Sequence, residues 1–483
     1  MEIHHYESGE EADMEWEKLL SAERFVRQEG GPERWGRSDY DTIICSTLFR
    51  RLQDKAQVFP LEEDDYVRTR LTHSLEVSAM GKKLGESLFD RLRREKKDPW
   101  FQSHWAKEFS DVLLCAGLVH DIGNPPFGHF GEYAMREWFQ ANLNSLTLGE
   151  KRVTELLSWG QLQDLYHFEG NAQSLRLLSK TPYLGRIEGF NLSYSVLASI
   201  IKYPVSSEDL VDDNNPRHYK KMGYNCAEKQ LFSKVSEVTG LDGCRHPLSY
   251  VLEAADDMAY RTSDLEDAMV KKVLTLSQIT EGLHRYEAEL ARSGVREETK
   301  EQVGQCVRKL HQLYEDELKA GGRKPELTAV QRWNQYMQKI MASDAVNSFA
   351  DNYSQIMDGG FQGDLFEGTV SGHIIAAIAR LSEEFIYTSS LKIKTELLGR
   401  RVIESLLGQF MPAAVKYDTE EKMTFIERRT MDIISGFYKS MYHGEAAGKG
   451  RRERLYLRIL MVTDYISGMT DSYAKRLYKE LFG

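Results

Sequence analysis

One stretch of the chain, residues 115–132, concentrates the side chains whose types and spacing could support catalysis. An apolar run ends there in adjacent His120 and Asp121. An imidazole beside a short carboxylate at a helix end is a common way to hold a divalent metal ion. His129 and Glu132 follow in a glycine-punctuated turn, and such a pair is suited to proton transfer. A lone His-Asp pair is more often the polar end of an ordinary helix, so the assignment depends on the rest of the chain.

Two predicted helices position the first histidines. Apolar spacing predicts a helix over about residues 108–119, and Gly123, Pro125 and Pro126 stop it, because proline lacks the amide donor and clashes with the preceding turn. Another helix is predicted to open in the segment Arg-Thr-Arg-Leu-Thr-His, which ends at His73, since leucines at mostly four-residue spacing follow. His73 is therefore expected near a helix start, beside two arginines.

A third helix is predicted over residues 247–269, with Pro247 in its first turn. Asp256, Tyr260 and Asp264 are four residues apart, so they project from one face. Such a polar stripe fits a solvated face as well as a binding site, and spacing alone leaves both open.

Two further polar positions come from shorter signals. Gln57 interrupts the basic stretch 50–58, which by itself fits a solvated helix face. Lys202 is expected in the last turn of a helix that ends before Pro204.

The whole chain has the composition of a globular protein. It has 483 residues, of which 41% are hydrophobic and 28% charged, and it contains no apolar run of the roughly 18 residues that a membrane-spanning helix needs. The five cysteines are scattered without a Cys-x-x-Cys pair, and the N-terminus lacks the features of a signal peptide, so a cytoplasmic protein with reduced thiols is expected. The net charge of −11 means that an anionic substrate would need local cations and a metal ion.

The predicted fold class is all-α, because no convincing alternating strand pattern occurs. The expected organisation has four parts: an N-terminal arm, a helical core, a charged helical insertion broken by Gly321 and Gly322, and a C-terminal helical region that completes the core and forms oligomer contacts. These parts cover residues 1–37, 38–274, 275–345 and 346–483.

The order of the candidate ligands, His73, then His120-Asp121, then Asp256, is the pattern of the HD superfamily. Three more motifs extend the resemblance: His-Phe-Glu-Gly-Asn-Ala-Gln at 167–173, Glu-Ala-Ala-Asp-Asp-Met-Ala-Tyr at 253–260 and Asp-Tyr-Ile-Ser-Gly-Met-Thr-Asp at 464–471. Together they resemble the bacterial dGTP triphosphohydrolases. The Asn-Pro-Pro sequence after His120-Asp121 is closer to the longer, type-one class than to the shorter dNTPases.

The resemblance implies an HD-domain core and the metal-dependent hydrolysis of a deoxynucleoside triphosphate, dGTP in the first instance, to the deoxynucleoside and tripolyphosphate. It implies Mg²⁺ or Mn²⁺ as the cofactor, because imidazoles and carboxylates leave coordination positions for water and a phosphate oxygen. The implied metal ligands are His73, His120, Asp121 and Asp256, with Asp257 as the adjacent alternative to the last. The implied catalytic residues are His129, as acid or base, and Glu132, which orients it.

The same resemblance implies a substrate-binding set. Arg70 and Lys202 match phosphate-binding positions, Tyr260 matches the residue packed on the deoxyribose, and Gln57 and Asp264 match positions near the 3′-hydroxyl. Glu169 and Asn171 are interpreted as structural residues or as residues that support those in contact with the metal or substrate. The residues that meet guanine are expected in the C-terminal region, in its part before residue 450, which none of the motifs covers.

Several alternatives stay open at this point. The chain could be a dNTPase of broader base specificity, another HD phosphohydrolase or phosphodiesterase, or a nucleotide-sensing or single-stranded-DNA-binding protein. His129, Glu132, Lys202 and Tyr260 argue against a bare HD site, which needs none of them. The resemblance also implies a homo-oligomer, commonly a hexamer, and the negative net charge weakens the case for DNA without excluding a basic groove.

Overall fold

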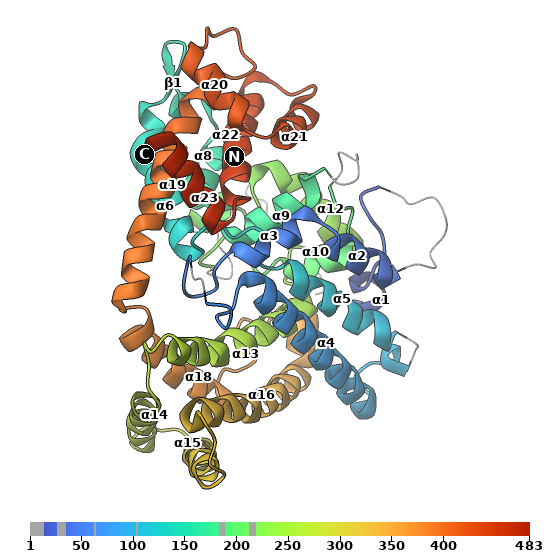
Figure 1. Ribbon diagram of the computed structural model, residues 1–483. Helices are drawn as coiled ribbons and strands as arrows, with labels where there is room; N and C mark the ends of the chain where they lie inside the picture. Colours follow the sequence, from blue (N-terminus) through green and yellow to red (C-terminus); the bar gives the residue numbers. More distant parts are fainter. Residues whose placement is uncertain (1–13, 27–34, 62–63, 103–104, 183–188, 212–218) are drawn as a thin grey trace.

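The structure is a computed structural model that describes residues 14–26, 35–61, 64–102, 105–182, 189–211 and 219–483. The described residues are mostly helical, which confirms the predicted fold class (Figure 1). A two-stranded antiparallel hairpin, β1 (Thr147–Leu148) with β2 (Lys151–Arg152), interrupts the helices. No helix within the described ranges is long and apolar enough to cross a membrane.

The helices of the first half are α1 (Trp16–Leu19), α2 (Trp35–Ile44), α3 (Thr47–Arg51), α4 (Arg70–Glu95), α5 (Ala106–Val119), α6 (His129–Asn142), α7 (Val153–Leu156), α8 (Trp159–Tyr166), α9 (Gly170–Lys180), α10 (Tyr194–Ile200), α11 (Ser207–Val211) and α12 (Lys229–Thr239). Those of the second half are α13 (Pro247–Val270), α14 (Leu276–Ala291), α15 (Glu297–Lys319), α16 (Pro325–Asp351), α17 (Tyr353–Met357), α18 (Val370–Leu381), α19 (Ser390–Lys416), α20 (Phe425–Ile433), α21 (Gly436–Ala446), α22 (Arg451–Ser467) and α23 (Asp471–Phe482). Short 3₁₀ turns lie at Leu52–Asp54, Pro99–Gln102, Leu143–Ser145 and Cys226–Glu228, and a π-helical turn lies at Ser382–Ile386.

The helices α4, α5 and α13 form the centre of the molecule and pack against one another. The start of α4 is fixed by a reciprocal cap, in which the Thr69 side chain accepts the Thr72 amide and the Thr72 hydroxyl oxygen accepts the Thr69 amide. The crossing of α4 and α5 is close because Gly117 has no side chain: a Cβ there would lie 2.6 Å from the Ser78 Cα. Helix α5 ends at Val119 and α13 begins at Pro247, as the sequence predicts.

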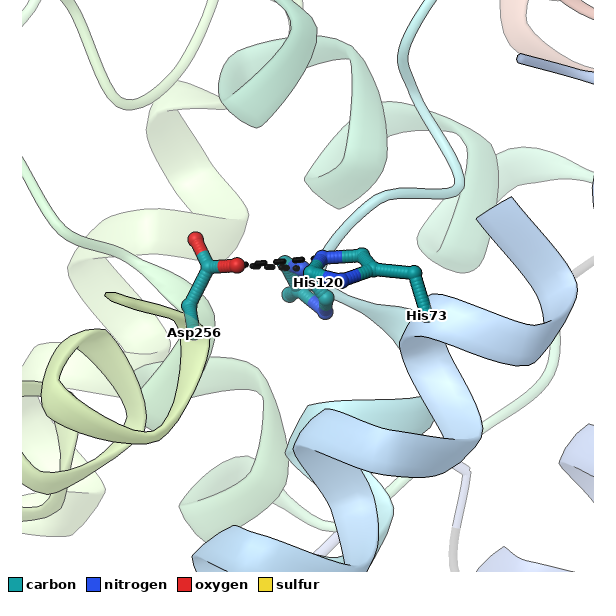
Figure 2. A group of neighbouring side chains, drawn as sticks. All are labelled: His73, His120 and Asp256. Carbon is teal, nitrogen blue, oxygen red and sulfur yellow. Dashed lines mark ion pairs between the residues drawn. The ribbon is translucent and has the colours of Figure 1, made fainter. Parts of the chain in front are cut away.

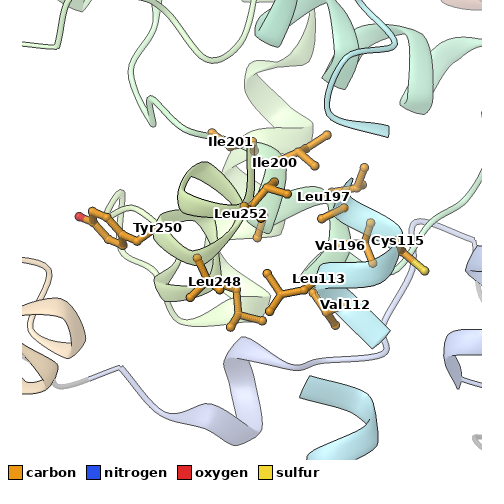
Figure 3. Close-up of a cluster of buried hydrophobic side chains, with 14 of the residues drawn as sticks. Val112, Leu113, Cys115, Val196, Leu197, Ile200, Ile201, Leu248, Tyr250 and Leu252 are labelled. Carbon is orange, nitrogen blue, oxygen red and sulfur yellow. The ribbon is translucent and has the colours of Figure 1, made fainter. Parts of the chain in front are cut away.

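Three hydrophobic clusters hold the helices together. The first joins α4, α5, α10 and α13, and Figure 3 shows its side chains from the last three of these helices. The second packs α6 and α8 against α19, α21, α22 and α23, so the C-terminal helices pack on helices from the first half of the chain. The third joins the C-terminal end of α13 to α14, α15, α16 and α18.

The charged segment after residue 274 is helical, as predicted, with α15 and α16 packed side by side. Gly321 lies between them with a φ of +70°, a conformation that suits glycine. Helix α14 and α15 lie at one end of the molecule, and the β1–β2 hairpin lies with α20 at the other (Figure 1). Two of the predicted boundaries fall inside helices, because residue 38 lies in α2 and residue 345 lies in α16. Much of the predicted N-terminal arm, residues 1–13 and 27–34, lies outside the described residues. The four-part division stays a prediction.

A buried ionic cluster around Arg176 ties α9 to the C-terminal helices. The Arg176 side chain is 1% exposed; its Nε lies 2.8 Å from Asp464 Oδ1, and its Nη1 lies 2.8 Å from Glu228 Oε1. Its Nη2 lies 2.9 Å from Glu445 Oε2. One guanidinium thus pairs with three carboxylates: Asp464 on α22, Glu228 in the turn before α12, and Glu445 on α21.

Replacing Arg176 by alanine is expected to lower the free energy of unfolding by about 3–5 kcal/mol, because buried carboxylates lose their counter-charge. Urea unfolding followed by circular dichroism measures this. Lys234→Ala, which removes an exposed pair with Glu237, is the matched control and should change stability by less than about 1 kcal/mol. Equal stability of both variants would contradict the assignment.

Candidate active site

A single cavity of about 640 Å³ brings together side chains from across the chain. Ten of the eleven site residues predicted from the sequence line it, and the eleventh, Glu132, lies behind His129. Arg70 and His73 come from α4, His120 and Asp121 from the end of α5, and Asp256, Tyr260 and Asp264 from α13; Gln57, His129 and Lys202 come from a loop, the start of α6 and the segment after α10.

His73, His120 and Asp256 form a cluster whose possible ligand atoms all lie within 4.8 Å of one another (Figure 2). The His73 Nε2 lies 3.0 Å and the His120 Nε2 lies 3.7 Å from the same oxygen, Asp256 Oδ1. Three helices that are far apart in sequence therefore deliver imidazole and carboxylate donors to one point. This donor set is typical of sites for first-row divalent metals.

The orientation of His120 supports a metal site. Its Nδ1 lies 2.9 Å from the Gly117 carbonyl oxygen, so this nitrogen carries the proton. The Nε2 then carries the lone pair; it is buried and has no hydrogen-bond partner among the described residues. A backbone carbonyl that fixes the tautomer of a histidine in this way is the usual arrangement behind a metal-binding imidazole. The residues present therefore fit a divalent metal ion.

Asp121 faces both imidazoles but is also bound to other side chains. Its Oδ2 lies 3.8 Å from the His73 Nε2 and 2.6 Å from the Arg70 Nη1, and Asn124 donates to its Oδ1. Burial alone would raise the pKa of Asp121, but the charge of Arg70, together with the neighbouring His120 and His73 imidazoles, outweighs burial and holds that pKa well below its usual range. Asp121 is thus held as a carboxylate.

The two adjacent carboxylates of α13 have different surroundings. Asp256 faces the imidazoles, and although burial opposes ionisation, the hydrogen bond from His73 and the nearby imidazoles lower its pKa. Asp257 lies 3.3 Å from the Arg261 Nε, and burial raises its pKa to about 6. Of the two, only Asp256 belongs to the His73–His120 cluster.

His129 and Glu132 form a second unit at the edge of the cavity. They lie in the first turn of α6, which corrects the expectation of a non-helical turn. The His129 Nδ1 lies 3.2 Å from Glu132 Oε2, and Glu132 Oε1 accepts the Gly170 amide at 3.0 Å. Burial opposes ionisation of Glu132, but the hydrogen bond and charge of His129 lower its pKa overall. The His129 side chain is 69% exposed, so its other nitrogen is accessible.

Cations in the cavity wall are each paired with a carboxylate. Lys202 follows the end of α10 instead of lying in its last turn as expected, and it forms an ion pair with Glu253. Burial would lower the pKa of Lys202, but the Glu253 carboxylate raises it overall. Lys221, which the sequence analysis missed, lies 3.0 Å from Glu169 Oε1. It follows a polar stretch without a motif, so no sequence signal marked it.

Two further polar side chains of the cavity wall carry oxygen acceptors without partners among the described residues. The Gln57 Oε1 and Asp264 Oδ1 are buried and have no hydrogen-bond partner within the described part of the chain. Burial and the charge of Asp267 raise the pKa of Asp264 to about 7. A hydroxyl group of a ligand would satisfy such oxygens, and Tyr260 lies one helical turn before Asp264 in the same wall.

The C-terminal region supplies part of this wall through Tyr387, Lys392 and Glu396. Lys392 donates to the Val58 carbonyl oxygen at 3.1 Å and lies 3.4 Å from Glu396 Oε1. These residues fall outside every motif of the sequence, and only the four-residue spacing of Lys392 and Glu396 at the start of α19 could have indicated a shared face.

Comparison with known proteins identifies one matching family and several relatives that are similar over almost their full length. Residues 70–168 match the HD domain family. A protein of Listeria innocua named deoxyguanosinetriphosphate triphosphohydrolase-like protein is 39% identical over 97% of this chain and 100% of the relative. A protein of Synechocystis sp. with the same name is 31% identical over 97% and 99%. The deoxyguanosinetriphosphate triphosphohydrolase of Cronobacter sakazakii is 30% identical over 96% of this chain and 97% of its own length.

The different surroundings of Asp256 and Asp257 generate a test by metal binding. We expect Asp256→Asn to weaken Mn²⁺ binding, measured by calorimetry on metal-stripped protein, by more than the roughly 10–100-fold that loss of an orienting neighbour costs. Asp257→Asn is the matched control and should keep the affinity within a few-fold. Equal losses in both variants would contradict a metal site centred on His73, His120 and Asp256.

Proposed function

The chain belongs to the HD-domain family of deoxyguanosinetriphosphate triphosphohydrolase-like proteins, and from this premise we propose that it hydrolyses deoxynucleoside triphosphates, with dGTP preferred, to the deoxynucleoside and tripolyphosphate. The observation that supports the proposal is the set of side chains that one cavity brings together. A cluster of imidazoles and carboxylates, a His-Glu pair and a pair of unpartnered oxygens lie in it together. Such a set of groups matches a substrate that carries both a phosphate chain and a sugar hydroxyl.

The metal site supports the phosphate end of the proposal. His73, His120 and Asp256, with Asp121 beside them, would hold Mg²⁺ or Mn²⁺. When bound, the ion supplies positive charge that polarises an oxygen of the α-phosphate. The Arg70–Asp121 hydrogen bond keeps this carboxylate ionised and in place.

The reaction breaks the bond between the α-phosphorus and the 5′-oxygen of the sugar. The oxygen of the attacking water forms the new bond to phosphorus, the water loses its proton, and the 5′-oxygen leaves with the bonding electron pair and must gain a proton. His129 is the proposed acid or base for these transfers. Glu132 holds its Nδ1, which leaves the exposed Nε2 free to exchange a proton with the reacting atoms.

The charges around the cavity support binding of a polyanion. Arg70, Lys202 and Lys221 are bound to carboxylates in this structure, so their charges are already in place and oriented. A triphosphate, with nearly four negative charges, would compete with these carboxylates for the same donors. At the other end, Gln57 and Asp264 are proposed to meet the 3′-hydroxyl, and Tyr260 is proposed to pack on the sugar, where close contact excludes a 2′-hydroxyl.

The reaction is tested by its products. Metal-stripped protein is incubated with each of dGTP, dATP, dCTP, dTTP and GTP, with and without Mn²⁺ or Mg²⁺, and the products are separated by ion exchange. We expect deoxynucleoside and intact tripolyphosphate only with metal, and a loss of about 10²–10⁴-fold in His129→Ala, the usual contribution of acid–base catalysis. Formation of pyrophosphate and monophosphate would favour another HD phosphohydrolase and sink the proposal.

The preference for dGTP is supported by Glu396 in the C-terminal part of the wall. Guanine presents two adjacent N–H donors on its N1 and N2 edge, and a carboxylate is an acceptor-only group that can receive both. Adenine has an acceptor at N1 and would leave such a carboxylate poorly matched.

We expect Glu396→Gln to lower the ratio of kcat/KM for dGTP over dATP by about tenfold, in line with the 1–3 kcal/mol that a matched pair of hydrogen bonds contributes to base discrimination. The matched control is Glu404→Gln, two turns further along α19, where the carboxylate pairs with Arg400. An unchanged ratio in Glu396→Gln would remove this residue from base recognition and leave the reaction itself untouched.

Two partners remain part of the proposal. A homo-oligomer, commonly a hexamer in this family, is supported by exposed apolar side chains on α19: Leu391, Ile393 and Leu397. Binding of single-stranded DNA is supported by the charge of residues 390–483, which carry 17 Lys and Arg against 12 Asp and Glu in an otherwise acidic chain.

A further inference from the structure

The C-terminal motif at residues 464–471 takes no part in the chemistry above, yet its last residue lies directly behind the cavity. Asp471 is 1% exposed and begins α23. The start of that helix is already capped by Thr470, whose side chain accepts the Tyr473 amide. The Asp471 carboxylate is therefore not needed to cap its own helix.

Each oxygen of the Asp471 carboxylate binds a different loop of the cavity. Its Oδ1 accepts the Phe127 amide at 2.9 Å, and its Oδ2 accepts the Ala56 amide at 3.0 Å. Ala56 precedes Gln57, and Phe127 lies two residues before His129. One carboxylate thus joins the loop that carries the proposed sugar contact to the loop that leads into the proposed acid or base.

A second link joins the same three segments. The Lys55 side chain is 2% exposed, and its Nζ donates to the Asn124 carbonyl oxygen at 2.6 Å and to the Ser467 carbonyl oxygen at 2.7 Å. Asp471 accepts a hydrogen bond from an amide of each of the two loops. Lys55 donates hydrogen bonds to a carbonyl group of one loop and to a carbonyl group of the C-terminal motif. The two links together cross-connect loops that are about 70 residues apart in sequence.

The backbone conformation of the loop before His129 requires stabilising contacts from other segments of the chain. Phe127 has a φ of +65° and Gly128 has a φ of +62°. A left-handed conformation is unfavourable for a bulky side chain, so it persists only where surrounding contacts impose it. The hydrogen bond from the Phe127 amide to Asp471 is one such contact, and the direction in which α6 presents His129 depends on it.

We propose that Asp471 is a positioning residue that fixes the separation between Gln57 at the sugar end and His129 at the reacting end of the substrate. The inference rests on the proposed function for the roles of those two residues. Its physical consequence is specific: recognition of the 3′-hydroxyl and the rate of the chemical step depend on one carboxylate that touches no substrate.

The test uses Asp471→Asn in the full chain. An amide has one acceptor oxygen and one NH₂ group, so it accepts one loop amide and opposes the other donor with its own N–H. We expect the ratio of kcat/KM for dGTP over 2′,3′-dideoxyguanosine triphosphate to fall at least about fivefold, together with kcat. Gln57→Ala should lower the same ratio, and adding Asp471→Asn to Gln57→Ala should lower it no further, because the two act on one contact.

The matched control is Ser472→Ala. Ser472 is the next residue, and its hydroxyl donates to Asp54 Oδ1 at 2.9 Å, so it links α23 to the turn before Ala56 at an exposed position but does not reach the loop of Phe127. We expect the substrate ratio to be unchanged in this variant. A general loosening of α23 would lower activity on both substrates in parallel and leave the ratio intact, and that result for Asp471→Asn would overturn the proposal.

A second measurement does not depend on any substrate. In the unmodified protein, hydrogen–deuterium exchange should find the Ala56 and Phe127 amides protected although both lie in loops, and in Asp471→Asn at least one of them should exchange faster. Rapid exchange of both amides in the unmodified protein would overturn the link even if the variant did not fold. If the unmodified protein released no tripolyphosphate but the amides were protected, the proposed function would fail while the link between the loops stood.

Discussion

The close packing of α4 against α5 is the constraint on which the site depends. Gly117 allows the two backbones to approach, and His120 and Asp121, which follow the end of α5 at Val119, face His73 on α4. A side chain at position 117 would push the helices apart and separate the imidazoles. Asp256 on α13 completes the cluster only because α13 packs on α4 and α5 through the apolar side chains of the same core (Figure 3).

Burying so many charges in one place requires that each has a partner. Asp121 is held by Arg70, Glu253 by Lys202 and Arg245, and Glu169 by Arg136 and Lys221. Removing one partner from such a pair leaves an uncompensated charge, which costs more than the pair itself contributes. The positive and negative charges of the side chains around the cavity are therefore close to balanced. The proposed anionic substrate and metal ion could bind by exchanging partners with these groups, since the donors are already oriented and no isolated charge has to be created.

The sequence predicts the helices that carry chemistry because their apolar spacing is local, and it predicts α5, the start of α4, and α13 nearly to the residue. Prediction from the sequence is wrong where the role of a residue depends on its tertiary contacts. Gly131 looks like a helix breaker, but a Cβ there would lie 2.1 Å from the Pro126 carbonyl oxygen, so the glycine allows the first turn of α6 to pack closely on the loop before it. Periodicity also cannot separate Asp256 from Asp257, which differ only through what each one faces. Lys221 and Glu396 carry no pattern, because their place depends on how distant segments pack.

The division of labour between segments follows from where each residue lies. The match to the HD domain covers residues 70–168, which include His73, His120, Asp121 and His129. Asp256 and the residues proposed for the sugar and the base lie outside it, on the loop before α4, on α13 and on α19. The second hydrophobic cluster packs α19, α22 and α23 onto α6, so the end of the chain is fixed to the helix that begins with His129. If the proposed roles hold, substrate selection can change through the outer segments while the chemistry of the inner ones is kept, because Asp471 and Lys55 connect the two sets of loops.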